Sequence, residues 1–492
     1  MRGQKVHEKF LYEIWKNRNF SKTLSTKNGD QIEIIDSGVE NKDLGGPDFK
    51  NARIKIGNIT YLGDVEIDSF QSDWKIHGHY FNKKYNKVIL HVFFNNDGDK
   101  PFVFTQEGRK VQSISLESFL SKDINSILHK AILSERKERI YIMPCSEYNN
   151  NIDERIKLDF IYELGIKRFK KKCQNLIARI KEIVYLRELN LKEPIIRYEL
   201  DEQFYNRKFT HKDFGNTLIW QQLFYESVFE ALGYSKNKDI MRDLAGAVNI
   251  DFFNLFRDKE NLVNIIESAL FNISGLMPNI YKIPDEETSE YVKHLVQYWS
   301  ELKLKYDGRT FKPEQWHFFK LRPQNFPTIR IAGGARILYR ILNQDMIGKL
   351  IKKTEIVKDF KKLSGIFRNQ IIVKGEGFWK KHFVFDQSAK KDINYFIGLS
   401  RADEIIINIV LPFLAVYFEI FGNEGLKQKI IKLYSNYYQI SENHLVEEVS
   451  STLKINDAWK RSILYQGILD LYRSYCSRNK CLDCKIGERI FS

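Results

Sequence analysis

The chain has 492 residues, of which 43% are hydrophobic, and a formal net charge of +15. With only 10 prolines and no low-complexity tract, the composition excludes a largely disordered chain and predicts an ordered protein of two or more domains. The basic excess favours an anionic partner, and nucleic acid, DNA in particular, is the partner we expect. A lysine-rich genome would produce the same excess, so that alternative stays open.

The sequence predicts neither a membrane segment nor secretion. No run of about 18 apolar residues is present, since the most apolar stretch, residues 405–420, is interrupted by Asn408 and Pro412. The first ten residues are charged and lack the apolar region of a signal peptide. Five cysteines, an odd number, indicate a reducing compartment. We therefore expect a cytoplasmic protein with no membrane partner.

The first 120 residues alternate between helical and extended patterns. Apolar residues at helical spacing predict an amphipathic helix over residues 5–20. A Gly57-Asn58 turn between two apolar-alternating runs predicts a β-hairpin over residues 52–68. Further strands are expected at residues 31–35, 88–94, 102–104 and 111–114. The pattern predicts a mixed α/β module over residues 1–120.

From residue 121 onward the apolar spacing is mostly helical. Helices are expected at residues 153–190, 217–232, 261–275, 289–304, 403–421 and 459–475. Pro323, Pro327 and a Gly-Gly pair indicate a loop and a helix entrance near residues 322–336. The predicted fold is therefore α+β, with the α/β module followed by a helical body over residues 121–492. Residues 121–310 and 311–492 are its candidate subdomains.

Acidic residues gather on the predicted hairpin. Asp48 enters its first strand after Pro47. Asp64, Glu66 and Asp68 alternate along the second strand, and alternation places them on one face. Carboxylates this close repel one another unless a cation, a basic side chain or solvent offsets their charge. We expect a Mg²⁺ or Mn²⁺ site, and a solvated hairpin face is the alternative.

This segment resembles the core of the PD-(D/E)xK nucleases, in which Pro-Asp begins one strand and an acid lies on the next, two positions before a lysine. The resemblance implies that Asp48 and Glu66 bind the metal. It also implies a further acid from the preceding helix, Glu8 or Glu13, of which we favour Glu8. Asp68 stands at the lysine position, where some nucleases of this fold carry a carboxylate.

Two histidines, His77 and His79, follow the acidic strand. In an extended segment they would face the same way. Imidazole suits Mn²⁺, Zn²⁺ or a general base near neutral pH, so both are candidate catalytic residues beside Asp48, Glu66 and Asp68. Hydrogen bonding of both rings to backbone or phosphate is the alternative. The lysines that follow are candidates to replace the missing motif lysine: Lys83, Lys84 and Lys87.

Nucleic-acid contacts are expected from Lys83 and Lys84 and from the loop between Trp316 and Arg330, which mixes arginines with aromatic residues. Arg322 and Arg330 are the candidates there, because guanidinium groups bind phosphate while a nearby ring stacks on a base. A loop packed between helices, with both arginines bonded to carbonyl groups, is the alternative.

Three of the five cysteines lie within nine residues: Cys476, Cys481 and Cys484. Thiolates at such spacing bind Zn²⁺ or an iron–sulfur cluster. Either Cys145 or Cys173 would supply the fourth ligand. Cys145 follows the α/β module, so its use would hold the end of the chain to that module. Three reduced thiols without a ligand are the alternative.

Several blocks together resemble one bacterial family, designated domain of unknown function 2851. They are residues 8–15, 46–49, 65–67, 72–74, 77–79 and 321–330 and the closing cysteines. The resemblance covers nearly the whole chain and implies no activity. The family pattern has histidine where this chain has Asp68 and asparagine where it has Asp64. This difference favours Asp48 and Glu66 as the metal ligands. We expect a metal-dependent nuclease acting on DNA. The alternatives are a non-catalytic nucleic-acid-binding protein with a degenerate core and a helical interaction protein.

Overall fold

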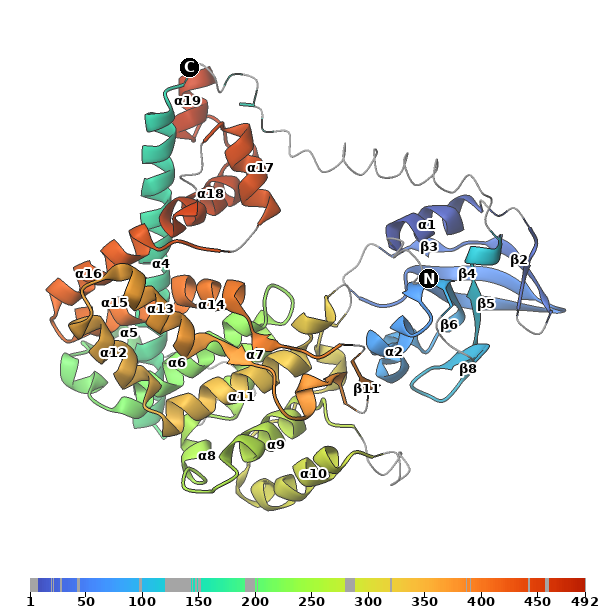
Figure 1. The fold of residues 1–492 in the computed structure, drawn as a ribbon, viewed down its shortest axis with the longest axis horizontal. Coiled ribbons are helices and arrows are strands. Elements are labelled where there is room, and N and C mark those ends of the chain that lie inside the picture. Colours follow the sequence, from blue (N-terminus) through green and yellow to red (C-terminus); the bar gives the residue numbers. More distant parts are fainter. Residues whose placement is uncertain are drawn as a thin grey trace. The chain divides into compact units, whose positions relative to one another are not determined.

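The computed structural model forms two units, shown in Figure 1. The first comprises Met1–Ile140 with Pro313–Phe326, and the second comprises Tyr141–Lys312 with Pro327–Ser492. The structure describes residues 8–491 except 19, 21, 27–28, 42–44, 97–99, 120–142, 144, 147, 149–151, 191–199, 201, 279–287, 319–320, 386, 390, 441–442 and 456–459. The sequence did not indicate that residues 313–326 belong with the N-terminal unit.

A mixed eight-stranded sheet forms the centre of the N-terminal unit. Its strands are β1 (Leu24–Ser25), β2 (Gln31–Asp36), β3 (Val39–Glu40), β4 (Phe49–Ile56), β5 (Ile59–Phe70), β6 (Val88–Asn95), β7 (Phe102–Phe104) and β8 (Lys110–Ser115). The order is β1-β2-β4-β5-β6-β8-β7, with β3 beside β4. The β4–β5 pair is the predicted hairpin, whereas β5, β6 and β8 run parallel.

The two faces of this sheet carry different layers. Helix α1 (Glu8–Asn17) places Leu11, Ile14 and Trp15 in one apolar core, together with Val65 and Ile67 of β5. The other face is covered by the crossover between β5 and β6. Parallel strands require such a crossover, and here it consists of α2 (Asp73–Ile76) and two short 3₁₀ turns, His79–Phe81 and Lys83–Tyr85. The crossover therefore lies over the polar side of β5.

The second unit is built mainly of helices. They are α4 (Glu154–Glu188), α5 (Glu202–Asn206), α6 (Thr217–Leu232), α7 (Lys238–Ala247), α8 (Ile250–Asn254), α9 (Leu262–Ser274), α10 (Glu290–Leu302), α11 (Pro327–Asn343), α12 (Met346–Ile356), α13 (Phe360–Ile371), α14 (Leu399–Ile405), α15 (Leu411–Ile420), α16 (Glu424–Asn436), α17 (His444–Thr452), α18 (Ser462–Ser474) and α19 (Lys485–Phe491). Short strands β9 (Val373–Lys374), β10 (His382–Val384), β11 (Gln387–Ser388) and β12 (Tyr395–Ile397) pair as β9–β12 and β10–β11. The predicted helices are confirmed, except that a π-helical turn at Ile406–Val410 separates α14 from α15.

Helices α4 and α18 pack with an unusually close approach. A Cβ added at Gly165 of α4 would lie 2.8 Å from Ile463 Cγ1, and one at Gly467 of α18 would lie 2.8 Å from the Ile161 carbonyl carbon. Each helix therefore offers the other a position without a side chain. This contact fixes the end of α18, and the cysteines that follow it, beside α4.

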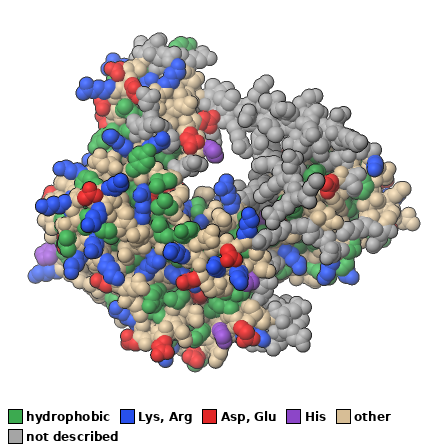
Figure 2. Space-filling model, in the orientation of Figure 1, with side chains coloured by type: hydrophobic (Ala, Val, Ile, Leu, Met, Phe, Trp, Pro, Cys, Tyr) green, Lys and Arg blue, Asp and Glu red, His purple; other side chains and the backbone are tan. Residues whose placement is uncertain are grey.

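Within the described residues, no helix is both long and apolar enough to cross a membrane. On the face drawn in Figure 2, the lysine and arginine side chains of the helical unit are interspersed with acidic and apolar ones. The basic excess of this unit therefore forms no single uninterrupted track on that face.

Candidate metal site

Two of the three buried acids of β5, Glu66 and Asp68, are more deeply buried than the third, Asp64. Glu66 and Asp68 are each 1% exposed, and they lie under the crossover, while Val65 and Ile67 enter the apolar core on the other face. Both acids reach the histidines, as alternation along a strand predicts. Asp64 lies apart from them, beyond a break in the β5–β6 register, and accepts a hydrogen bond from the Asn51 backbone N–H at 3.1 Å.

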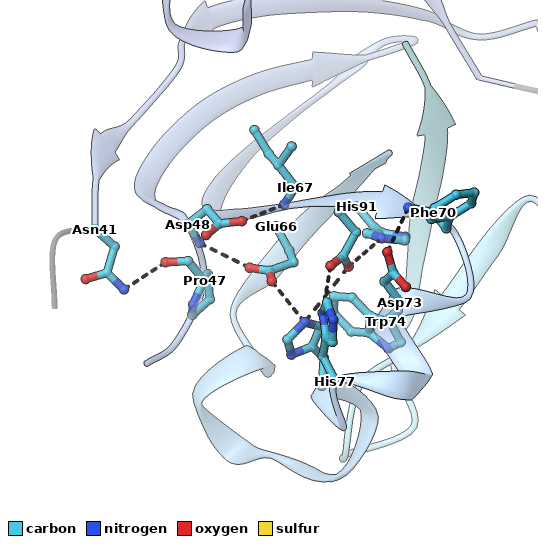
Figure 3. A network of polar contacts seen from close by, with 12 residues as sticks. Asn41, Pro47, Asp48, Glu66, Ile67, Phe70, Asp73, Trp74, His77 and His91 are labelled. Carbon is cyan, nitrogen blue, oxygen red and sulfur yellow. Dashed lines mark hydrogen bonds and ion pairs between the residues drawn. The ribbon is translucent and has the colours of Figure 1, made fainter. Parts of the chain in front are cut away.

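Asp68 lies at the centre of a polar network formed with three histidines. Figure 3 shows this part of the structure, with Glu66, His77 and His91 labelled. The Asp68 Oδ1 lies 3.0 Å from His77 Nδ1, and its Oδ2 lies 3.1 Å from His91 Nε2. His79 Nε2 is 3.9 Å from Oδ2. Ligand atoms of Asp68, His77 and His79 all lie within 4.8 Å of one another, and among the described residues no other group of three meets that distance. These three side chains are therefore the best-placed ligands for a single cation.

A local turn brings the two histidines to this face. The segment is not extended, which corrects the sequence interpretation: His77 ends α2, and His79 begins a 3₁₀ turn. Gly78 between them has φ +75°, and a Cβ there would lie 2.5 Å from Phe81 Cζ. This left-handed turn, which glycine alone adopts readily, directs both rings toward Asp68.

Buried aromatic rings hold the imidazoles in place. His79 stacks on Tyr85 with ring centroids 4.0 Å apart. Trp74 packs against both His79 and His91, at 5.4 and 5.2 Å. His91 is fixed from its other side by Ser113 Oγ, 3.0 Å from Nδ1. The histidines are therefore oriented before any ligand binds.

Glu66 supplies a fourth oxygen beside the three ligands. Its Oε2 accepts a hydrogen bond from the Asp48 backbone N–H at 3.1 Å, and its Oε1 lies 3.0 Å from His79 Nε2. That nitrogen is buried, and no group satisfies it in hydrogen-bonding geometry. Buried polar atoms without such a partner are costly, and a cation at this point would satisfy both the nitrogen and the carboxylate. Two imidazoles with carboxylates form a donor set that suits Zn²⁺ or Mn²⁺.

Asp48 adjoins the cluster, but its carboxylate is already engaged. One oxygen accepts from the Tyr12 hydroxyl, and the other accepts from the Ile67 N–H at 3.0 Å. Burial, followed by the charge of Glu66, raises the pKa of Asp48 well above its usual value despite these hydrogen bonds. Glu66 therefore contacts the backbone of Asp48 rather than its carboxylate. Asp68 is better placed than Asp48 to bind a cation together with the histidines.

The charges in the cluster are set by burial and by the histidines. Burial would raise the pKa of Asp68, but its polar contacts with His77, His79 and His91 outweigh burial and hold that pKa well below its usual value. Burial opposes charge on His77, yet its contact with Asp68 raises its pKa. For His91 burial prevails, and its pKa is lowered. The histidines therefore favour the ionised form of Asp68, and Asp68 in turn favours the charged form of His77.

A basic pocket of about 450 Å³ lies next to this cluster in the N-terminal unit. Its lining residues are Gly45, Gly46, Pro47, Lys50, Asp64, Lys83, Lys84 and Lys87. Pro47 directly precedes Asp48, and Lys84 lies against the backbone of Gly45 and Gly46. The predicted lysines therefore gather with Asp64 at a pocket rather than directly on the carboxylates.

The remaining predicted residues have different surroundings. The Glu8 and Glu13 side chains lie outside the described part of the structure, although both residues belong to α1. Arg322 is exposed in the N-terminal unit. Arg330 is 6% exposed within α11 and donates to the Phe396 carbonyl at 2.6 Å and to the Tyr234 hydroxyl at 2.7 Å. Arg330 is therefore a buried structural residue, which corrects its assignment as a nucleic-acid contact.

The predicted cysteine ligands all belong to the helical unit. Cys145 lies in that unit together with Cys476, Cys481 and Cys484, so a metal there would not join the chain end to the α/β module as the sequence suggested. The fifth cysteine, Cys173, lies within α4.

Sequence reasoning did not assign His91, Tyr12, Tyr85 or Trp74 to the site. One signal was available for His91, because it is the only polar residue in the apolar run from Val88 to Phe94 and that run pairs with the acidic strand. The tyrosines and the tryptophan gave no such signal, since buried aromatic residues are common in any core.

A family model described as "Protein of unknown function (DUF2851)" matches residues 8–188 and 207–444. The chain belongs to this family. The matched residues include the whole Asp68 cluster and Cys145, but they end before the three C-terminal cysteines. Neither the curated proteins nor the solved structures contain a match.

Proposed function

We propose that this DUF2851 protein is a metal-dependent hydrolase of phosphodiester bonds, with DNA as its substrate. The observation that carries the proposal is the buried group of Asp68, His77 and His79 beside Glu66. A divalent cation held there would lower the pKa of a bound water molecule and neutralise charge on a phosphate oxygen. The adjacent lysine pocket offers the positive charge that a phosphate backbone requires.

The side chains divide into groups with separate tasks. Asp68, His77 and His79 would hold the cation. His91 would orient the Asp68 carboxylate by hydrogen bonding, as outer partners of ligands do in metal sites. Glu66 is placed either to complete the ligand set or to accept a proton. Lys83, Lys84 and Lys87 would bind the phosphate. The Pro-Asp entry of β4 and the acid on β5 retain the resemblance to the PD-(D/E)xK core, which supports the same class of reaction.

The test uses purified full-length protein with linear duplex DNA, single-stranded DNA and RNA, each with Mg²⁺, Mn²⁺ or EDTA. We expect cleavage of DNA that requires the metal and falls about 100-fold or more in Asp68→Asn. Glu33→Gln, which removes an exposed acid from β2 of the same sheet, is the matched control and should cleave normally.

Binding is measured on the same substrates as a function of salt. Lys84→Ala should weaken DNA binding and reduce the salt slope by about 1, whereas Lys361→Ala, at an exposed position of α13, should change neither. Salt-dependent binding without cleavage under any metal condition would overturn the hydrolase and leave a non-catalytic nucleic-acid-binding protein. The absence of both would overturn the nucleic-acid assignment as well.

A further inference from the structure

The helical unit brings its C-terminal cysteines to the beginning of α4. The ring of Tyr475, just before Cys476, packs on Phe160 of α4 with centroids 5.8 Å apart. Lys485 Nζ, just after Cys484, lies 2.5 Å from Glu163 Oε2 of the same helix. Both contacts fall within the first turns of α4. The segment that carries the three cysteines is therefore fixed at both ends against one part of that helix.

Cys145 approaches the same place from the other direction, because it lies shortly before α4 begins at Glu154. Cys476 interacts electrostatically with Cys145, Cys484 and Cys481, so the four side chains lie in one neighbourhood. Cys145 and Cys484 are buried, and none of the four forms a disulfide.

Two local features shape the cysteine loop. The Gly487 backbone lies against Cys481, and a Cβ at Gly487 would be 3.1 Å from Cys481 Cα, so the loop is tightly closed. The Gly487 and Ile486 backbone N–H groups donate hydrogen bonds to the Cys484 sulfur. Amides directed at a sulfur stabilise the thiolate form, which is the form that binds metals.

We propose that Cys145, Cys476, Cys481 and Cys484 together bind one thiolate-coordinated metal centre, either zinc or iron–sulfur. Four cysteines are the full ligand set of a structural zinc site and of an iron–sulfur cluster. The Cys-x₄-Cys-x₂-Cys spacing of the last three also occurs in plant-type iron–sulfur proteins, where the distant cysteine follows them, whereas here Cys145 precedes them. This site is separate from the Asp68 cluster and independent of the proposed hydrolysis.

The metal centre would join the chain end to the start of α4. The thiols are spaced more widely than the Asp68 ligands, since among the described residues only that cluster has its ligand atoms within 4.8 Å. Binding therefore requires the cysteine side chains to rotate inward.

Cys173 is excluded, because its thiol donates to the Pro412 carbonyl oxygen at 3.8 Å and it lies further along α4 than Phe160 and Glu163, which contact the cysteine loop.

The experiment determines zinc, iron and acid-labile sulfide in full-length protein purified without oxygen. The Asp68→Asn background excludes metal held by the other site, so this result does not depend on the proposed function. We expect one centre per chain. Zinc without sulfide identifies a zinc site, and iron with sulfide and visible absorbance identifies a cluster; either supports the proposal.

Single variants then assign the ligands. Cys145→Ser and Cys476→Ser should each lose the metal, whereas Cys173→Ser should retain it. Because a ligand variant could fail to fold, chelator treatment of the Cys173→Ser protein provides a second measurement, and the helical unit should then unfold at a lower temperature. Absence of zinc and iron, or metal retained in both ligand variants, would overturn the proposal.

Discussion

Replacing Asp68 by asparagine is the sharpest perturbation of the candidate metal site. The asparagine side chain would keep the shape and one carbonyl oxygen but lose the charge that now faces three imidazoles, at 3.0, 3.1 and 3.9 Å. Changing even an outer hydrogen-bond partner of a metal ligand weakens metal affinity by about 10- to 100-fold. Loss of a ligand charge should therefore raise the dissociation constant of the cation by about 100-fold or more, which is about 2.7 kcal/mol of binding free energy.

Mn²⁺ is the suitable probe, because it favours carboxylate and imidazole over the thiols of the helical unit. Free Mn²⁺ is followed by electron paramagnetic resonance during titration of wild type, Asp68→Asn and Glu33→Gln. Wild type and Glu33→Gln should show the same tight site, and Asp68→Asn should show it weakened or lost. Equal affinity in all three proteins, with each folded by circular dichroism, would refute the role of Asp68.

Three further outcomes follow from the same geometry. The contact with Asp68 raises the pKa of His77, so its contribution to the free energy of unfolding is full below the unfolded-state pKa of about 6.5 and is lost as pH rises through the folded-state value. His77→Gln should therefore destabilise the N-terminal unit in acid more than in base, and denaturant unfolding across pH checks this. Gly78→Ala should cost more than the about 1–2 kcal/mol of its left-handed backbone and should weaken Mn²⁺ binding, because of its contact with Phe81. Gly108→Ala, at φ +80° with open space around it, measures the backbone cost alone. Arg330→Ala should destabilise the helical unit by about 2–4 kcal/mol without changing DNA affinity, since its hydrogen bonds to Phe396 and Tyr234 are internal. An affinity loss like that of Lys84→Ala would contradict this.

The sequence predicted the β4–β5 hairpin, further strands of the N-terminal sheet and several helices, because their patterns are local. The Gly57-Asn58 turn and the alternation on both sides of it define the β4–β5 hairpin, and alternation alone places Glu66 and Asp68 on one face. The six helical segments predicted after residue 150 follow from apolar spacing in the same way, whereas α5, α7, α8, α12, α13, α16, α17 and α19 were not predicted. The return of residues 313–326 to the N-terminal unit has no local pattern, so it appears only in the structure.

The site was predicted only in part, because it depends on a turn and on long-range packing. Composition and order indicated that His77 and His79 belonged with the acids, but an extended segment was expected where Gly78 makes a left-handed turn. The β5–β6 pairing brings His91 to Asp68, and it joins residues 23 positions apart. The engagement of Asp48 by Tyr12 spans 36 positions. Spacing along the chain therefore favoured Asp48 as the principal ligand, whereas the geometry favours Asp68.

The central claim is that one divalent cation binds between Asp68, His77 and His79. Anomalous diffraction from crystals of the full-length protein grown with Mn²⁺ tests it most directly. We predict a single strong peak in the N-terminal unit within coordinating distance of those three side chains and of Glu66. A Mn²⁺ peak held by other residues, or none in that unit at saturating Mn²⁺, would contradict the claim.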